Sequence, residues 1–386
     1  MDGSFQFGIE EEFFLANAIT RGTPDRSLDA FHAAVHRKLP EAERELLQSQ
    51  IEIASPPSTS FAEARSVLSG LREQLAAVGR DHGLLLLASG THPLAQWSQQ
   101  EETEKARYQA LTAEMQMLGR RNVVCGMHVH VEVPDPDRRV DLMNRLLPYT
   151  PLLLALSASS PIWQGRTTGL AAYRLSVWGE MPRTGLPELF RDVGEYERLV
   201  ATMISAGAIK DASFLWWTLR PSMRYPTLEL RVADSCTKLE DTLAIAALYR
   251  CLVRRVVREP TLNAGLTGAS RAIVSENLWR AQRDGVRASF IDEASGTSVP
   301  CSEYLTSLLD QLASDAAELG CNAELDRSRE IVAHGTSADR QLAILQQFGG
   351  SDDASHASMS AVVDWIASTT VGLVTSSGLA GAARLP

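Results

Sequence analysis

Four short stretches of this sequence place acids, histidines or arginines at alternate positions, with mostly apolar residues between them. They span residues 8–14, 50–53, 127–132 and 228–232. Side chains along a β-strand point alternately to the two faces of a sheet, so a strand at each place would separate ionisable from apolar groups. We therefore predict strands whose shared polar face forms a site.

The acids of these stretches include Glu10, Glu12, Glu52 and Glu229, and His128 accompanies them. Carboxylates that gather on one sheet face repel one another and resist ionising together unless a cation neutralises them. Oxygen-rich ligand sets suit Mg²⁺ or Mn²⁺ better than zinc. Because this set exceeds the needs of one six-coordinate ion, the pattern predicts a site for about two or three Mg²⁺ ions, with Mn²⁺ as a possible substitute.

Three arginines, Arg220, Arg224 and Arg231, surround the fourth stretch. Guanidinium groups suit phosphate or carboxylate ligands, and divalent ions that bridge phosphate oxygens are the usual device of phosphoryl transfer. Acids for metal and arginines for anions together suggest a nucleotide. The sequence has neither a Gly-x-x-x-x-Gly-Lys-Ser/Thr loop nor a Gly-x-Gly-x-x-Gly turn after a strand, so metal and arginine would have to hold any ATP.

Each motif also has a purely structural interpretation. Glu10 and Glu12 could form a solvated strand end, and Glu229 with Arg231 could form a cross-strand ion pair of little energetic consequence. A His-x-His pair on an alternating strand is often the polar face of a half-exposed sheet. Repetition of the alternation in four separate stretches favours a site.

The elements that must position these residues follow from apolar periodicity and turn residues. Ser60 and Glu63 form a capping-box pattern at the start of a long helix. Strands are predicted at 5–16, 46–54, 84–89, 123–133 and twice within 213–232, and helices at 27–39, 60–82, 103–119, 138–147, 151–159, 195–206, 239–258, 270–284, 301–319, 338–347 and 359–368. Strands concentrate in residues 1–235 and helices in 236–386, which is typical of an α+β protein, here with one domain over residues 1–386.

Composition narrows the class of protein. The 386 residues are 45% hydrophobic and 22% charged, as in a globular chain with a sizeable core. A net charge of −10 argues against a nucleic-acid surface, and the basic cluster Arg254, Arg255 and Arg258 is interpreted as a solvated helix flank. We predict reduced, mostly buried cysteines, no membrane contact and, without a secretion signal at the start, a cytoplasmic location.

A set of ordered motifs resembles known families. Residues 7–15 and 126–130 resemble the catalytic signatures of glutamine synthetase, and residues 229–234 resemble the Glu-x-Arg strand of that superfamily. A closer resemblance is to the carboxylate-amine ligase family, also called glutamate-cysteine ligase type 2. Its motifs are similar to residues 50–56, 90–93, 125–131, 159–166, 220–221, 225–232 and 275–280. The resemblance runs from about residue 5 to about residue 345, which is nearly the whole chain.

The resemblance implies a glutamine synthetase-like catalytic domain with a mainly antiparallel sheet, one face forming the active site and helices packed on the other. It implies an ATP-dependent carboxylate-amine ligase that forms an amide through an acyl phosphate, with a γ-glutamyl group transferred to an amine such as cysteine. The amine itself is not encoded in the metal strands. A homodimer is also what the resemblance suggests.

The resemblance also assigns residues to roles. Glu10, Glu12, Glu52, His128 and Glu229 would bind Mg²⁺, while His130 and Arg231 would contact the phosphates of ATP. Arg220 and Arg224 are candidates for the nucleotide or acyl-phosphate anions, and Arg220, Arg231 and His130 are the catalytic candidates. Arg166 and Arg174 are candidates for the substrate carboxylate.

Two other functions stay open. In a metal-dependent hydrolase of the amidohydrolase kind, His128 and His130 would hold a metal that activates water, and turnover would not need ATP. In a non-catalytic sensor, a ligase-like fold would bind a nucleotide or an amino acid. The acid-heavy set of candidate ligands counts against the hydrolase.

Overall fold

The computed structural model describes residues 4–24, 27–104, 113–348 and 355–372. In these residues the main sheet contains β1 (Phe7–Asn17), β2 (Ala42–Arg44), β3 (Gln50–Ala54), β4 (Leu84–Leu87), β5 (Met127–Glu132), β10 (Leu219–Pro221) and β11 (Thr227–Leu230). Its strand order is β10-β11-β5-β1-β3-β2, and β4 pairs with the end of β1. All of these pairings are antiparallel, so the predicted mixture of helices and antiparallel sheet is confirmed.

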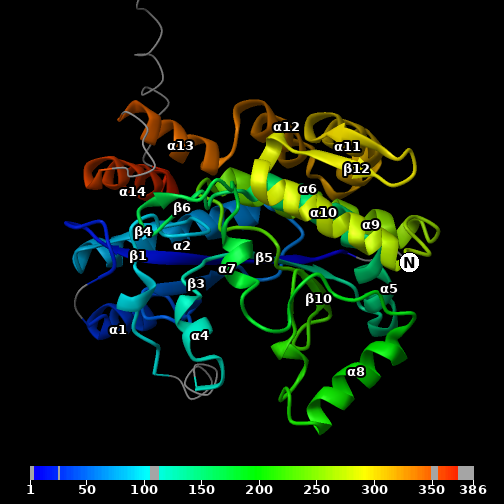
Figure 1. The fold of residues 1–386 in the computed structure, drawn as a ribbon, viewed down its shortest axis with the longest axis horizontal. Coiled ribbons are helices and arrows are strands. Elements are labelled where there is room, and N and C mark those ends of the chain that lie inside the picture. The colour runs from blue at the N-terminus through cyan, green and yellow to red at the C-terminus, as the bar shows by residue number, and fades with distance from the viewer. Residues whose placement is uncertain (1–3, 25–26, 105–112, 349–354, 373–386) are drawn as a thin grey trace, which may run out of the picture.

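Helices surround this sheet (Figure 1). They are α1 (Asp29–Lys38), α2 (Phe61–Asp81), α4 (Met117–Arg121), α5 (Pro136–Leu146), α6 (Thr150–Ser157), α7 (Arg174–Trp178), α8 (Val193–Ser205), α9 (Leu239–Arg258), α10 (Gly268–Asp284), α11 (Cys301–Leu319), α12 (Asn322–His334), α13 (Ser337–Gln347) and α14 (His356–Thr370). Helix α9 packs against β1 and β5, and α2 packs against β4 and α9. Figure 1 shows α9, α10, α11 and α12 gathered on one side of the sheet.

The central strand β1 shows why one face of the sheet is polar. Phe7 and Ile9 are buried, whereas Glu10 and Glu12 are only partly covered, as the alternation of residue types predicts. Glu11 breaks the simple pattern because it points to the buried face. The sheet therefore has an apolar face against the helices and an acidic face on the opposite side.

Glu11 is held on the buried face by an arginine from α2. Arg72 donates from Nε and Nη2 to the two carboxylate oxygens of Glu11, at 2.9 and 2.5 Å. Its other hydrogens reach the backbone oxygens of Thr237, Cys236 and Thr370. Both side chains are sealed from solvent, so this pair ties β1, α2 and the end of α14 together.

Local sequence accounts for the start of α2. The Ser60 hydroxyl accepts a hydrogen bond from the backbone N–H of Glu63, as the capping pattern predicts. The second bond of the predicted capping box, from the Ser60 backbone N–H to the Glu63 carboxylate, is wrong. That carboxylate instead accepts from the Ser58 hydroxyl at 2.6 Å. The Ser60 backbone N–H donates to that same hydroxyl at 2.9 Å.

The helical second half contains two elements that the sequence analysis missed. They are α12 and a hairpin of β12 (Ser289–Asp292) with β13 (Thr297–Pro300). The prediction that the basic cluster in α9 is a solvated flank holds for Arg258, which is exposed, and is wrong for the other two arginines. Arg255 is buried, and Arg254 and Arg258 both bind the fully buried carboxylate of Asp315 in α11.

Other boundaries differ from the predictions. Residues 161–185 form two short pairings, β6 (Ile162–Trp163) with β7 (Arg166–Thr167) and β8 (Thr184–Gly185) with β9 (Trp216–Trp217), besides α7. The predicted helix at 103–119 falls partly on residues 105–112, which lie outside the described residues. The predicted strand at 46–54 begins only at Gln50 and is preceded by the unpredicted β2.

The five cysteines are buried and free, as predicted. Among the described helices, each lacks either the length or the apolar character that a membrane crossing requires.

Candidate active site

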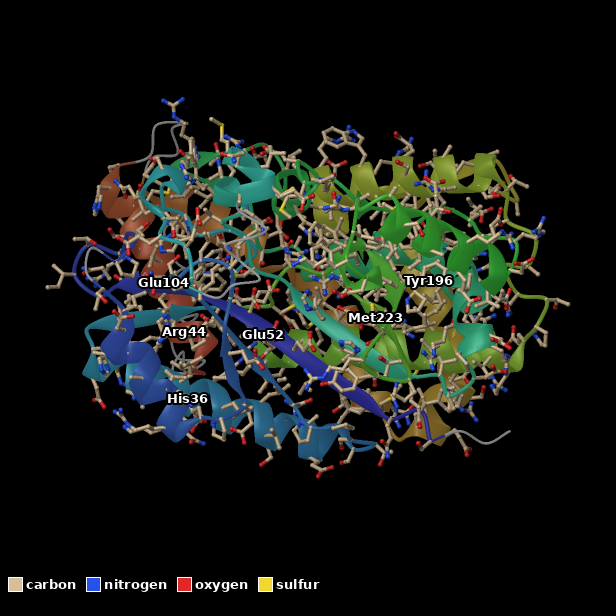
Figure 2. The ribbon with its side chains drawn as sticks, turned by 90° about the horizontal axis from the view of Figure 1, so that it is seen from below. His36, Arg44, Glu52, Glu104, Tyr196 and Met223 are labelled. Carbon is tan, nitrogen blue, oxygen red and sulfur yellow. The ribbon has the colours of Figure 1, made fainter. Side chains whose placement is uncertain are left out.

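Strand register brings the predicted polar residues onto one face of the sheet. The facing pairs are Glu10 with His128, Glu12 with Glu52, His130 with Glu229, and Glu229 with Arg220. Arg231 directly follows β11 and stays beside Glu229. Figure 2, seen from below the view of Figure 1, shows Glu52 beside the blue strand β1.

These side chains line a cavity of about 370 Å³. The predicted site residues in its wall are Glu10, Glu12, Glu52, His128, His130, Arg174, Arg220, Arg224, Glu229 and Arg231. Arg166 is the exception: it is exposed on β7 and is not part of this wall. The structure thus gives no geometric support to Arg166 as a ligand of the substrate carboxylate, because its side chain lies outside the cavity.

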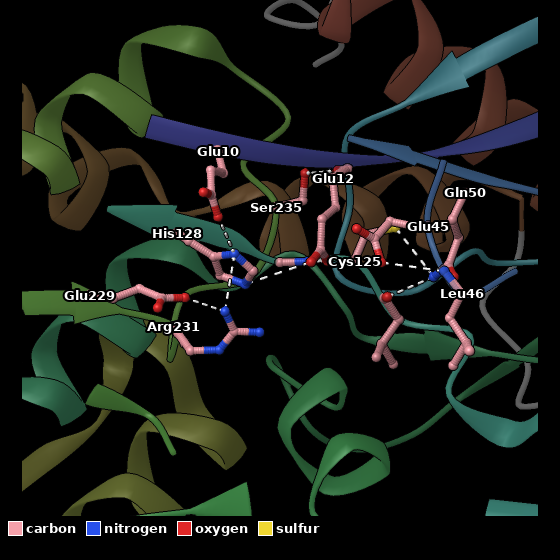
Figure 3. A network of polar contacts seen from close by, with 12 residues as sticks. Glu10, Glu12, Glu45, Leu46, Gln50, Cys125, His128, Glu229, Arg231 and Ser235 are labelled. Carbon is pink, nitrogen blue, oxygen red and sulfur yellow. Dashed lines mark hydrogen bonds and ion pairs between the residues drawn. The ribbon is translucent and has the colours of Figure 1, made fainter. Parts of the chain in front are cut away.

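The two histidines of β5 connect the acids of β1. His128 contacts Glu10 through Nδ1 at 3.1 Å and Glu12 through Nε2 at 3.6 Å. His130 reaches Glu10 through Nε2 at 3.3 Å, and its Nδ1 pairs with the Thr227 hydroxyl at 2.9 Å. Figure 3 shows His128 between these carboxylates and Arg231. The histidines therefore lie where charge from three strands converges.

Glu229 lies between two arginines. Arg220 donates to its carboxylate from Nε at 2.8 Å and from Nη2 at 3.2 Å, and Arg231 donates to it from Nη1. Burial opposes the charge on Glu229, but Arg231 and Arg220 outweigh it and lower the pKa of the carboxyl below its usual value. Glu229 is therefore held as an anion on the cavity wall.

The pKa values of the acids on β1 and β3 are shifted in opposite directions. Burial also opposes the charge of Glu10, but hydrogen bonds and charges from His128 and His130 lower its pKa below the usual value. The pKa of Glu52 is raised, first by burial and then by the nearby carboxylates of Glu45, Glu10 and Glu12. Negative charge is therefore incompletely compensated around Glu52, and a cation bound there would relieve it.

The donor set fits divalent cations. Two groups bring one ligand atom per residue within 4.8 Å of one another: Glu10 with His128 and Glu229, and Glu12 with Glu52 and His128. The Nε2 atoms of His128 and His130 are buried, and each lies beside a carboxylate oxygen, of Glu12 at 3.6 Å and of Glu10 at 3.3 Å. Carboxylate oxygens with an imidazole nitrogen are a ligand set that suits Mg²⁺ or Mn²⁺.

Arg174 and Arg224 occupy different depths of the cavity. Arg174, the first residue of α7, is buried, and its guanidinium lies over the Trp178 ring at 5.4 Å. Arg224 is exposed in the turn between β10 and β11, where it lies over the Tyr225 ring at 5.2 Å. An anion deep in the cavity could meet Arg174, whereas Arg224 can act only at the rim.

Several residues of the cavity were not predicted from the sequence. Glu43 and Glu45 reach the wall from β2 and its following residue, and their alternation around Arg44 is a signal that could have identified them. Trp178 and Trp216 add apolar surface. Trp178 lies in residues 161–185, which have no clear periodicity, and Trp216 lies where a strand is predicted, so strand alternation did not place these two rings at the site.

Comparisons with known proteins point to one family. The family model "Glutamate-cysteine ligase family 2 (GCS2)" matches residues 6–359. A protein of Bradyrhizobium sp. (strain ORS 278) named "Putative glutamate--cysteine ligase 2" is 44% identical over 371 residues, which cover 95% of this chain and 88% of the relative. A protein of the same name from Rhodospirillum rubrum is 41% identical over 380 residues, with 95% and 96% covered.

Solved structures share the fold. The glutamate–cysteine ligase of Francisella tularensis, in complex with AMP, superposes with a TM-score of 0.67 at 12% identity, covering 95% of this chain and 89% of that one. The bifunctional glutathione synthetase of Pasteurella multocida gives 0.68 at 15% identity over 94% of this chain, which spans about half (52%) of that protein. At such low identities the likeness concerns the fold.

Proposed function

Since the chain belongs to glutamate-cysteine ligase family 2 and is a ligase that forms carbon–nitrogen bonds, we propose that it joins a carboxylate of glutamate to an amine in an ATP-dependent reaction. The observation that carries this proposal is the cavity, in which acids from β1, β3 and β11 meet arginines from β10 and the end of β11. We also propose that this sheet is glutamine synthetase-like, with its acidic face as the catalytic face. The nucleotide in the Francisella tularensis complex is consistent with ATP as a substrate.

Glu10, Glu12, Glu52, His128 and Glu229 would hold the divalent cations. When bound, Mg²⁺ would offset the charge that develops on the transferred phosphoryl group. The repulsion among the carboxylates around Glu52 supports this assignment, because these acids stay charged together only beside a cation.

The arginines would bind and orient the anions. Arg231 and Arg220 already pair with Glu229, so their guanidinium groups are fixed before substrate arrives. His130 and Arg231 would contact the phosphates of ATP, and Arg224 would add charge at the rim. Arg174, deep in the same wall, would bind a carboxylate of the amino-acid substrate.

The reaction would proceed in two steps. The γ-carboxylate of glutamate attacks the γ-phosphorus of ATP, which forms an acyl phosphate and releases ADP. The amine then attacks the acyl carbon, loses a proton and displaces phosphate, which leaves an amide. The buried rings of Trp178 and Trp216 form part of the cavity wall, and they would limit the access of water to the acyl phosphate.

A phosphate-release assay tests the proposal. The intact protein is incubated with ATP, Mg²⁺ and glutamate against a panel of amines that includes cysteine, and products are identified by mass. We expect phosphate release that needs both glutamate and one of the amines. Glu229→Gln should reduce the rate by about 10²–10³-fold while the protein stays folded, because the amide keeps the volume but loses the charge.

The same assay separates the alternatives. Hydrolysis of amides without ATP would support the metal-dependent hydrolase, and nucleotide binding without turnover would support a sensor. A homodimer and a cytoplasmic location belong to the same proposal, and light scattering of the purified protein tests the former.

A further inference from the structure

Arg174 carries a positive charge on the cavity wall, and no carboxylate of the described residues is directly bound to it. Its Nη1 and Nη2 donate to the backbone oxygens of Val232 and Arg231, at 3.2 and 3.3 Å. Its Nε is buried and has no hydrogen-bond partner among the described residues. Because only two backbone oxygens hold this guanidinium, its position depends on how the backbone of Arg174 is fixed.

The backbone of Arg174 is fixed by a hydroxyl from another segment. Arg174 begins α7, and the N–H groups in the first turn of a helix have no acceptor within the helix. The Arg174 N–H donates to the hydroxyl oxygen of Ser160 at 2.9 Å. Ser160 therefore caps α7 at the residue whose side chain enters the cavity wall.

Ser160 is in turn oriented by Asp234. The Ser160 hydroxyl donates to Oδ2 of Asp234 at 2.6 Å, and the Ser159 N–H donates to the same oxygen at 3.0 Å. Asp234 is fully buried, and Ser157 anchors its backbone N–H at 3.1 Å. Its carboxylate also favours the charged form of Arg174 through space, which opposes the effect of burial on the pKa of that arginine.

Two glycines make room for this arrangement. A Cβ on Gly90 would lie 2.6 Å from the carboxylate carbon of Asp234 and 2.9 Å from Cβ of Ser160. A Cβ on Gly126 would lie 2.7 Å from Cζ of Arg174. The N–H of Gly126 also donates to Glu12, so the wall that receives Arg174 is continuous with the acidic face.

We infer that Asp234, acting through the Ser160 hydroxyl, is a positioning residue for Arg174 and thereby sets the affinity for an amino-acid carboxylate. The direct link is the chain of hydrogen bonds from Asp234 to Ser160 and from Ser160 to the Arg174 backbone. The identity of the bound carboxylate rests on the proposed function, whereas the positioning of Arg174 does not.

Hydrogen exchange tests the positioning without any activity. Ser160→Ala removes the acceptor of the Arg174 N–H, so that amide should exchange about tenfold faster or more. Asp234→Asn should accelerate it less, because the amide side chain can still accept from Ser160. Asp315→Asn is the matched control. Asp315 is as fully buried as Asp234, but it lies in α11 away from the cavity, where Arg254 binds it. Its substitution should not change the exchange rate of the Arg174 amide.

Steady-state kinetics test the consequence for the substrate. Asp234→Asn should raise KM for glutamate by about tenfold, with kcat and the KM for ATP changed by less than about threefold. In an Arg174→Gln background the same substitution should add little, since residues that act through one another are not additive. Asp315→Asn should leave KM for glutamate unchanged.

The outcomes are separable. Unchanged exchange at the Arg174 amide in both Ser160→Ala and Asp234→Asn would overturn the inference. Equal increases in KM for glutamate and ATP, or effects of Asp234→Asn and Arg174→Gln that simply multiply, would also overturn it. If wild-type protein releases no phosphate with glutamate, the proposed function fails, and the exchange experiment still decides whether Asp234 and Ser160 position Arg174. Should Asp234→Asn not fold, Ser160→Ala carries both measurements.

Discussion

Adjacent glutamates on β1 lie in opposite environments. Glu11 faces the helices, where Arg72 binds both of its carboxylate oxygens and neither side chain meets solvent. Glu10 and Glu12 face the cavity, where they meet His128 and other acids. One strand thus carries a fully paired carboxylate on one face and incompletely neutralised carboxylates on the other.

This difference distinguishes a carboxylate that stabilises the fold from carboxylates that can bind a ligand. The Glu11 carboxylate lies outside the cavity and both of its oxygens are bound by Arg72, so it serves to hold elements together. The cavity carboxylates instead share two histidines and lie within a few ångströms of one another, so they can bind a cation together. Changes on the buried face should therefore affect stability, and changes on the cavity face should affect binding and turnover.

The largest effect on stability is expected from Arg72→Met. The substitution leaves the Glu11 carboxylate buried without its partner and removes the donor to three backbone oxygens. We expect a loss of about 3–5 kcal/mol in the free energy of unfolding, measured by denaturant titration. Arg65→Met is the control on the same helix, since the Arg65 side chain is 41% exposed and its ion pairs with Glu240 and Glu324 should contribute less than about 1 kcal/mol. Equal losses in the two variants would contradict the comparison.

Glu10→Gln should show the opposite behaviour. We expect ATP-dependent turnover to fall by about 10²–10³-fold with little loss of stability, because the carboxylate charge is removed from the cavity face. At Mn²⁺ concentrations near 100 times its dissociation constant, wild-type protein should gain about 2.7 kcal/mol of stability, and the variant should gain much less. Both quantities are measured on the same preparations, by phosphate release and thermal unfolding.

The control for Glu10→Gln is Glu132→Gln. Glu132 lies on β5 outside the cavity wall and accepts hydrogen bonds from Ser4 and Gln6. Its substitution should leave turnover and the Mn²⁺ effect unchanged. Stabilisation by Mn²⁺ that persists fully in Glu10→Gln would place the cation elsewhere.

A smaller effect on the free energy of unfolding is expected when the pH is lowered, and it comes from the buried residue His92. Its Nδ1 accepts the N–H groups of Leu94 and Ala95, and burial lowers its pKa to about 4 from a usual 6.5. As pH falls, the unfolded chain takes up this proton first, so the stability that His92 contributes is complete above about pH 6.5 and is lost toward pH 4. We expect a loss of about 2 kcal/mol between pH 7 and pH 5 from this residue.

His92→Asn isolates that contribution, because the amide oxygen can replace Nδ1 as the acceptor. The difference in unfolding free energy between wild type and variant should shrink as pH falls from 7 to 5. A difference that stays constant over this range would show that His92 is not the titrating group.

Much of the acidic face could be predicted because strand alternation is a property of the backbone. Once Glu10, Glu12, His128 and Glu229 were assigned to strands, period two placed them on common faces without knowledge of the partners. The start of α2 at Ser60 followed from an equally local rule. The family motifs added the expectation that these separate strands belong to one catalytic sheet.

The remaining features depend on contacts between distant parts of the chain. Asp315 neutralises Arg254 and Arg258 from another helix, so a cluster that looks solvated in sequence is paired with a buried carboxylate. The exposure of Arg166 and the burial of Arg174 could not be distinguished either, since both occur in a segment without periodicity.

By itself the sequence determined which residue types recur on the faces of the strands, and with them the prediction of a metal- and anion-binding chemistry. Tertiary structure alone decided which charges are neutralised and which are held in place: Arg72 pairs with Glu11, and Asp234 with Ser160 holds the backbone of Arg174. The physical reason is that alternation is set by the local backbone geometry, whereas neutralisation requires two groups to be within a few ångströms of each other, and only the folded packing of helices on the sheet creates that proximity.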